Sequence, residues 1–449
     1  MPRCADTEPA DTEPAEAASP SWGRSPVETI RCHTRAVTTT PDEQLTPPRE
    51  RTAGFVVLVG LLSLLPAITT DMYLPSLPDV ARDLSTTEAG AQFTITGVLI
   101  GGAIGQLVVG PLSDRLGRRL PVLVGVSLHV VISLLCVAAG TIDQLATLRV
   151  AQGLASAGST VVAMAVIRDR YTGAEAARLM SRLMLVIAVA PLLAPTVGSV
   201  IAAQWGWRAV FVALALLGVG LLAVVVRFLP ETLPAERRIA HGVVASLRGY
   251  AGLLADRRFV ALAVIPGLGM AVIISYVAGS PFVLQQEYGL STQEFALVFA
   301  IGGTSMVSGS QVNAALLRRA GPVRLLRVAL PVTTLLGGAL LWVAATHAGG
   351  IVGLVGALWL MMATLGFVMA NASALAMTRH GERAGSAAAV IGFLQAGLAG
   401  VVSPLVGLLG GDAVAMTGVM LGSMVVALLV LALGTPAYRR GGWLVMGGA

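Results

Sequence analysis

The sequence predicts an all-α protein that crosses a membrane many times, and three observations support this prediction. The composition is 55% hydrophobic and only 12% charged, with a mean hydropathy of +0.80. Apolar runs long enough to cross about 30 Å of hydrocarbon as helices recur along the chain. Basic residues gather in every second segment between these runs. A soluble domain has a more even balance, so the bilayer is the expected solvent.

The apolar runs predict twelve transmembrane helices, each about 20 residues or longer. The first six lie near 53–78, 91–112, 120–139, 143–167, 179–203 and 207–228. The second six lie near 259–284, 292–316, 323–345, 349–376, 385–409 and 414–434. Glycine and proline interrupt several of these runs, so the number of helices is better defined than their ends.

The arginines indicate the orientation of the chain. Lysine is absent, and arginine precedes the first predicted helix and recurs in every second loop after it. The alternate loops hold only Arg82 and Arg208. Because short cytoplasmic loops are enriched in basic residues, both termini are expected in the cytoplasm. The net charge of +6 then reflects topology and contact with anionic lipid, and gives little support to nucleic-acid binding.

Composition and charge divide the chain into five expected parts. These are a disordered cytoplasmic tail at 1–50, a six-helix bundle at 51–228, a cytoplasmic linker at 229–257, a second six-helix bundle at 258–434 and a cytoplasmic tail at 435–449. The first tail is rich in Pro, Thr, Glu and Ala, which favours disorder. A misassigned start codon is an alternative explanation for it.

The two expected bundles share landmarks at nearly equal offsets. These are APTVG at 194–198 with SPLVG at 403–407 (offset 209), Pro75 with Pro281 (206) and Gly117 with Gly321 (204). Internal repeats of six helices are typical of secondary transporters, whose substrate cavity lies between the repeats near the membrane midplane. The repeat therefore predicts a transporter that works by alternating access.

Two charged residues lie inside predicted helices. At about 1.5 Å per residue, Asp71 in the first helix and Arg149 in the fourth both lie roughly 10 Å below the outer surface. An unpaired ion at this depth is costly, so each is expected to face a cavity or a partner. Their counterparts in the repeat, Val277 and Gly353, are neutral. We predict that Asp71 and Arg149 couple protons to transport; a half-hydrated aspartate and a helix-pairing arginine are the alternative.

Several segments resemble signatures of the major facilitator superfamily. GPLSDRLGRR at 110–119 resembles its loop 2–3 signature, RVAQG at 149–153 the helix 4 signature of drug:proton antiporters, and APTVG at 194–198 their helix 5 motif. With TTDMYLPSLPDVARDL at 69–84, AVIRDRY at 165–171 and SYVAGSPFVLQQEYGLS at 275–291, the chain most resembles the Bcr/CflA branch of bicyclomycin and chloramphenicol exporters over about 53–434. The resemblance implies a major facilitator fold of two six-helix bundles, a bacterial plasma-membrane location and a functional monomer.

The resemblance also assigns roles to the motif residues. In the family, the loop 2–3 cluster closes the cytoplasmic side in the outward-open state; here it comprises Gly110, Asp114, Arg115, Gly117 and Arg118. The second copy has Arg318 where the acid would be, so a symmetrical cluster is not expected. Basic loops are also required by topology alone, which is the alternative reading of these arginines.

Helices 4 and 5 each carry a motif that resembles those of drug:proton antiporters. The helix 4 signature contributes Gln152 and Gly153 beside Arg149. In helix 5 the motif residues Pro191, Pro195 and Gly198 predict a kink and a close approach to a neighbouring helix. The family's usual paired glycine is partly lost, and a kink without specific function is the alternative.

Polar or adaptable side chains within apolar spans are candidates for the substrate cavity. They are Tyr73, Gln106, Gln152, Met164, Tyr276, Gln285, Asn371 and Gln395. Hydrogen bonding between helices is an equal alternative for each. The three cysteines and five histidines are scattered, so neither a disulfide framework nor a metal site is expected.

These patterns predict proton-coupled export of small amphipathic drugs or metabolites, with small-molecule substrate, protons and membrane lipid as the partners. No cofactor is expected, since no G-x-x-x-x-G-K nucleotide loop is present and a proton gradient is the natural energy source. An uptake symporter of the same fold for a sugar or organic acid is the first alternative. A polytopic membrane enzyme or lipid-handling protein is the second, but the clustered catalytic residues that it needs are absent.

Overall fold

The computed structural model describes residues 49–171, 193–238, 243–378 and 384–438, together with Glu175, Leu179, Leu183 and His380. All regular elements in these ranges are helical, which confirms the all-α prediction. The first 48 residues, which fall in the predicted disordered tail, lie outside the described part of the chain, and so does Pro191.

The first half contains helices α1 to α7, with short turns between them. Their bounds are α1 Arg49–Asp71, the 3-10 helix η1 Leu74–Ser76, α2 Leu77–Asp83, α3 Glu88–Leu116, α4 Arg119–Val137, α5 Ile142–Arg170, a helical segment at 193–205, and α7 Trp207–Phe228. Threonine caps set two of the beginnings: Thr87 accepts a hydrogen bond from the Gly90 amide at the start of α3, and Thr141 accepts one from the Gln144 amide at the start of α5.

The linker and the second half follow. Their bounds are the 3-10 helix η2 Ala235–Arg237, α8 Val243–Ala255, α9 Arg257–Phe282, the π-helical turn η3 Val283–Glu287, α10 Thr292–Thr346, α11 Gly350–Thr378, α12 Ala384–Val402, α13 Leu405–Leu408 and α14 Ala413–Gly434. One predicted helix, 385–409, is interrupted: α12 ends before Pro404, which has no amide hydrogen with which to continue the helical bonding.

The long element α10 contains two of the predicted membrane helices. They meet at Gly321, whose φ of 70° and ψ of 159° are not helical. Gly117, its counterpart between α3 and α4, has a φ of 93°, so both halves use a glycine in a left-handed conformation at the same turn. In the described ranges, ten helices including α10 are long and apolar enough to cross a membrane. The remaining predicted span, 179–203, is described in part and is helical from 193.

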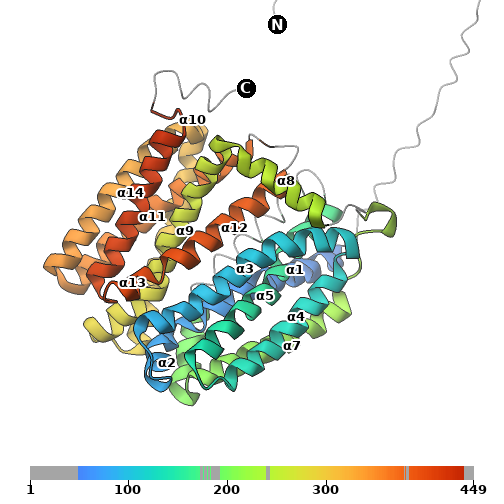
Figure 1. Cartoon of the computed structure of the whole chain (residues 1–449), viewed down its shortest axis with the longest axis horizontal. Coiled ribbons are helices and arrows are strands. Elements are labelled where there is room, and N and C mark those ends of the chain that lie inside the picture. The colour runs from blue at the N-terminus through green and yellow to red at the C-terminus, as the bar shows by residue number, and fades with distance from the viewer. Residues whose placement is uncertain are drawn as a thin grey trace, which may run out of the picture. The chain divides into compact units, whose positions relative to one another are not determined.

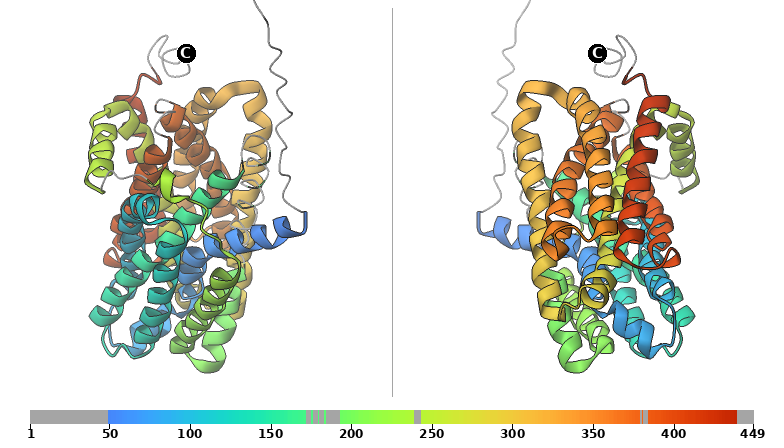
Figure 2. Two further views of the ribbon diagram at one scale, coloured as in Figure 1. Left: turned by 90° about the vertical axis from the view of Figure 1, so that its right-hand side faces the viewer. Right: turned by 90° about the vertical axis from the view of Figure 1, so that its left-hand side faces the viewer.

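The helices form two groups. In residues 48–449, α1, α3, α4, α5 and α7 pack on one another, as do α9, α10, α11, α12 and α14, and α3 against α12 is the most extensive contact between the groups (Figure 1). Figure 2 shows α8 at the same end as the last turns of α14. We call this end, which holds residues 115–119 and 318–327, the arginine-rich end, and the end with residues 83–88 and 405–412 the far end.

Large apolar side chains cover the outside of the long helices. Leu335, Val352 and Leu433 are each more than 70% exposed, at 74%, 78% and 78%. An exposed apolar surface of this extent is not compatible with water and is expected where helices face lipid tails. The outer surfaces thus agree with the spans that hydropathy predicts.

Candidate transport site

Arg149 of α5 is completely buried in the first half and is surrounded by aromatic and polar groups. Its Nη1 donates hydrogen bonds to the Thr69 carbonyl oxygen at 3.1 Å and to Oε1 of Gln152 at 2.6 Å. Its guanidinium carbon lies 4.8 Å from the ring centroid of Tyr73 and 5.7 Å from that of Phe211. Cation–π contact with two desolvated rings stabilises this charge, for which the described residues provide no ion pair.

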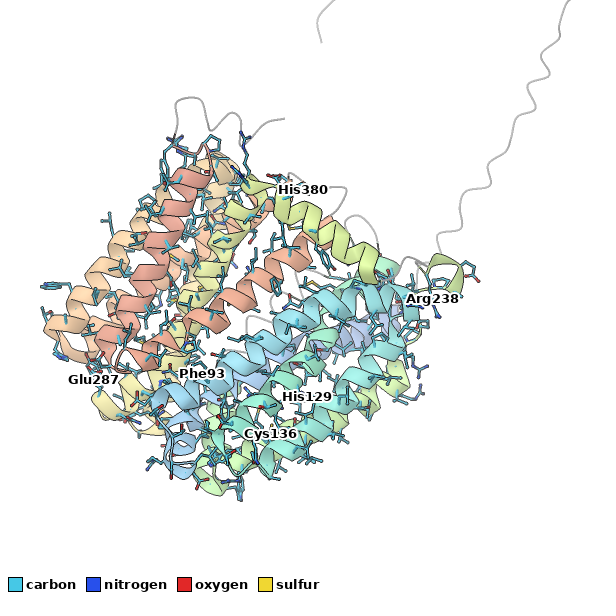
Figure 3. All side chains as sticks on the ribbon, in the orientation of Figure 1. Phe93, His129, Cys136, Arg238, Glu287 and His380 are labelled. Atoms are coloured by element: carbon cyan, nitrogen blue, oxygen red, sulfur yellow. The ribbon has the colours of Figure 1, made fainter. Side chains whose placement is uncertain are left out.

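A chain of hydrogen bonds continues from Arg149 to α4. Nε2 of Gln152 donates to Oγ of Ser133 at 2.8 Å, and that hydroxyl donates to the His129 carbonyl oxygen at 2.7 Å. Figure 3 places His129 and Cys136 inside the first half of the molecule. Thr69, Ser133 and Phe211 were not predicted from the sequence, although a serine one turn after a histidine in an apolar helix is a recognisable signal.

Buried donors around Arg149 remain unused. Among the described residues, Nε and Nη2 of Arg149 and both ring nitrogens of His129 have no hydrogen-bond partner. Each unsatisfied buried polar group costs about 1–3 kcal/mol. A buried cation with two donors left over is therefore more typical of a functional site than of a helix-packing contact.

Asp71 is the last residue of α1, two residues after the carbonyl that Arg149 contacts. It is partly exposed, and within the described part of the chain it makes no hydrogen bond or ion pair. The two charges that the sequence singled out therefore lie at a similar level without forming an ion pair. A carboxylate without a fixed partner is available to a proton or to a ligand.

Gly198 of the helix 5 motif lies directly against the backbone beside Asp71. A Cβ atom built on Gly198 would lie 2.0 Å from the carbonyl oxygen of Met72. Pro195 lies one turn earlier in the same helical segment. The motif glycine thus permits a backbone-to-backbone contact at the end of α1, as the sequence predicted.

Gly153 plays the same part between α3 and α5. A Cβ on Gly153 would lie 2.0 Å from the Val98 carbonyl oxygen, and one on Gly101 would lie 1.9 Å from that of Val150. In the helix 4 motif, therefore, Gln152 binds Arg149 while Gly153 sets the distance between two helices.

The loop 2–3 cluster is centred on Arg118, which is buried at the arginine-rich end. Its Nε donates to Oδ2 of Asp169 at 2.8 Å, and its Nη1 donates to Oδ1 of Asp114 at 2.5 Å and to Oγ of Ser113 at 2.8 Å. Burial lowers the pKa of Arg118, but the hydrogen bonds that it donates to Asp169 and Asp114 outweigh this and raise its pKa overall. Arg115 is exposed and takes no part in these contacts.

Glu231, in the segment after α7, completes this cluster and was not predicted. Its carboxylate accepts hydrogen bonds from the backbone amides of Arg118 at 2.8 Å, Arg119 at 3.3 Å and Leu233 at 3.0 Å. A Cβ on Gly117 would lie 2.4 Å from Oε2 of Glu231, so the loop glycine makes room for this carboxylate. The PETL sequence directly after α7 is the signal that was available.

The candidate cavity residues are not brought together into one site. Tyr73 and Gln152 both contact Arg149. Tyr276, in contrast, stacks on Phe299 with 5.3 Å between ring centroids, and Nδ2 of Asn371 donates to Oδ1 of Asn313 at 2.7 Å. The remaining candidates are partly buried on separate helices: Gln106 on α3 close to Gly392 of α12, Met164 on α5, Gln285 in η3 and Gln395 on α12. Tyr73 and Asn371 thus each contact residues of their own half, as expected if they form hydrogen bonds or packing contacts between helices.

Comparison with known proteins places this geometry in a family. Residues 59–404 match the Major Facilitator Superfamily. The chain is 37% identical to YdgK of Bacillus subtilis, an uncharacterised MFS-type transporter, over 85% of this chain and 96% of that protein. It is 28% identical to a bicyclomycin resistance protein homologue of Haemophilus influenzae (78% of this chain, 88% of that one) and 31% identical to multidrug resistance protein MdtL of Escherichia coli K12 (76% and 85%).

Solved structures agree on the fold. A D-xylose–proton symporter superposes with a TM-score of 0.69 at 18% identity, covering 85% of this chain and 97% of that one. A mutant of the nucleoside transporter NupG superposes with a TM-score of 0.69 at 14% identity, covering 86% and 100%. The chain is a multi-pass membrane transporter and not an enzyme, and it belongs to the Major Facilitator Superfamily.

Proposed function

We propose that the chain exports small amphipathic drugs or metabolites from the bacterial cytoplasm in exchange for protons. The observation that supports this most directly is the contact of Gly198 with Met72 beside Asp71. This contact places the helix 5 motif, which resembles that of drug:proton antiporters, beside Asp71, the carboxylate at the end of α1. The names of two relatives, a bicyclomycin resistance homologue and a multidrug resistance protein, point to the same class of substrate.

In this proposal Asp71 binds a proton or cargo in turn, and Arg149 holds the end of α1 in place. Arg149 contacts the Thr69 carbonyl oxygen, so its charge fixes the backbone two residues before the carboxylate. Cargo binds Asp71 when the site faces the cytoplasm, and a proton from outside displaces it when the site faces outward. The arginine-rich end is then cytoplasmic, with both termini on that side in the plasma membrane.

The loop 2–3 cluster is proposed to stabilise the cytoplasmic end of the first half. Arg118 joins α3 to the end of α5 through Asp114 and Asp169, and Glu231 attaches the segment after α7 to the same place. The described contacts of this cluster lie within the first half and the linker, so its action on the second half passes through the linker.

Proton flux in inverted membrane vesicles tests the proposal. With an imposed pH gradient and a pH-sensitive dye, an antiported substrate is expected to dissipate the gradient on addition. Candidate substrates come from tolerance assays with bicyclomycin, chloramphenicol and sulfonamides in a pump-deficient bacterium. Asp71→Asn is expected to abolish the response, whereas Asp143→Asn, an exposed acid at the start of α5, retains it.

Opposite proton movement would instead support the uptake symporter. Unchanged proton flux in Asp71→Asn would refute the proposed coupling residue. Unchanged tolerance to all of the compounds, with proton coupling intact, would narrow the substrate to a metabolite.

A further inference from the structure

At the far end, the turn before α14 rests on the first turn of α3, and this contact joins the two halves. Oε1 of Gln92 accepts a hydrogen bond from the Gly407 amide at 3.0 Å. A Cβ on Gly407 would lie 2.7 Å from the N and Cα atoms of Ala89. Only glycine permits this approach, so the surfaces at this end are in direct backbone contact.

Two carboxylic acids from opposite halves meet beside this contact. Glu88 is the first residue of α3, and Asp412 is the N-cap of α14. The Glu88 carboxylate lies against Gly411, where a built Cβ would be only 1.7 Å from Oε2. The negative charge of Asp412 disfavours a second negative charge on Glu88. Two ionised carboxylates on facing surfaces repel each other.

The two acids differ in how they are satisfied. Asp412 accepts a hydrogen bond from the Ala415 amide at 2.7 Å, and its neighbour Glu287 accepts one from the Ala413 amide at 2.8 Å. Oε2 of Glu88, in contrast, is buried and has no partner among the described residues, and the same holds for Nε2 of the fully buried Gln92. An ionised oxygen in that position is costly, whereas a protonated one is neutral and can donate a hydrogen bond.

Among the described residues at this end, no other charged group forms an ion pair with Glu88. The nearby basic residues are engaged with other acids: Arg82 with Asp79, and Arg208 with Asp83. His347 lies against the ring of Tyr288, at 6.4 Å between ring centroids, next to Glu287. Figure 3 shows Phe93 and Glu287 towards this end and His380 and Arg238 towards the other.

We propose that Glu88 and Asp412 form a proton-dependent latch that holds the two halves together at the far end. With a proton on Glu88, the carboxyl group is neutral and the halves stay in contact. When that proton returns to the aqueous phase, two carboxylates face each other and the contact between α3 and residues 405–412 opens. The step is a protonation alone, with no bond made or broken elsewhere. It needs neither cargo nor Asp71, so it stands or falls independently of the proposed function.

Distances between two spin labels measure the latch directly. The labels are placed at Phe93→Cys on α3 and Leu409→Cys on the facing turn, both exposed at 44% and 66%, in the full chain with Cys4, Cys32 and Cys136 replaced by serine. In lipid nanodiscs at low pH, pulsed electron paramagnetic resonance is expected to give one short distance. At high pH a second, longer distance is expected.

Three substitutions decide the assignment. Glu88→Gln keeps the shape of the side chain without its charge, so the short distance is expected at every pH. Asp412→Asn, which preserves the N-cap of α14, is expected to behave in the same way. Glu294→Gln is the matched control, because this exposed acid closes the capping box of α10 and glutamine retains that box; it keeps the pH response of the parent.

A pH response that persists in Glu88→Gln, or a parent chain whose distances ignore pH, would overturn the latch. Thermal unfolding of each purified variant verifies folding. If Glu88→Gln fails to fold, Asp412→Asn provides the same test, because it removes the other charge.

Discussion

The two halves share a fold but differ in where they bury charge. In the first half, Arg149 is enclosed by Tyr73, Phe211 and Gln152. Its counterpart in the second half is Gly353, and the counterpart of Asp71 is the buried Val277. The polar contact between Asn371 and Asn313 in the second half is neutral. A bundle of this family therefore does not need an internal arginine to fold, which separates the role of Arg149 from architecture.

Replacing Arg149 is expected to have the largest effect. Arg149→Ala removes hydrogen bonds to Thr69 and Gln152 and frees the end of α1, so transport is expected to fall by at least about tenfold, which corresponds to roughly 1.4 kcal/mol in the rate-limiting step. Arg149→Lys retains the charge but not the two-sided geometry, and we expect it to rescue folding without transport. Drug tolerance and thermal unfolding of purified protein measure the two effects.

Asn371→Ala in the second half is the matched comparison. It removes a neutral hydrogen bond to Asn313, so about 0.6 kcal/mol of stability is expected to be lost on average for a contact of this kind in a membrane. Full transport by Arg149→Ala would contradict a specific role of the buried charge in the first half. An equal loss of transport in Arg149→Ala and Asn371→Ala would contradict it as well.

Gly198→Ala is expected to have the next largest effect. The added Cβ would overlap the Met72 carbonyl oxygen, so α1 and the helix of residues 193–205 must separate. Overpacking of this kind costs about 1–3 kcal/mol. Gly220→Ala in α7, where nothing lies within 4 Å of a built Cβ, is the control. A lower unfolding temperature is expected for the first variant only, and equal values would show that α1 accommodates the methyl group.

The sequence predicted much of the fold because hydropathy and arginine periodicity record contact with lipid. It also placed Gly117 at a tight turn and Gly198 where two backbones meet, since only glycine allows these arrangements. The missed residues Ser133, Phe211 and Glu231 act through contacts between segments distant in the sequence. No periodicity within one helix specifies such partners. For the same reason, the sequence could not show which helix face each proposed cavity residue occupies, because tertiary packing decides it.

Replacing an arginine by alanine is expected to have different effects at the two equivalent turns. Arg118→Ala leaves Asp114 and Asp169 without their common partner, and hydrogen bonds to charged groups contribute about 1.5–3 kcal/mol each. Stability and transport are both expected to fall. Arg318→Ala, in the second copy, removes an exposed side chain and is expected to change stability little. Thermal unfolding of the two variants side by side measures the contrast, and a large loss in Arg318→Ala would indicate a second cluster.

The smallest effect is expected for Glu231, which joins the linker to the turn between α3 and α4. Burial raises the pKa of Glu231, but hydrogen bonds from the backbone amides of Arg118, Leu233 and Arg119 outweigh burial and hold it below its ordinary value of 4.5. A group whose pKa is lowered by folding contributes stability above its unfolded pKa, and that contribution is lost as the pH falls through the folded value. The unfolding temperature of the parent should therefore exceed that of Glu231→Gln at neutral pH, and the gap should narrow below about pH 4.5. A gap that is constant from neutral to acidic pH would mean that glutamine loses hydrogen-bond geometry rather than charge. If the difference in unfolding temperature instead widens in acid, the folded protein binds a proton on Glu231 more tightly than the unfolded chain does. That result would contradict the lowered pKa that the amide hydrogen bonds cause.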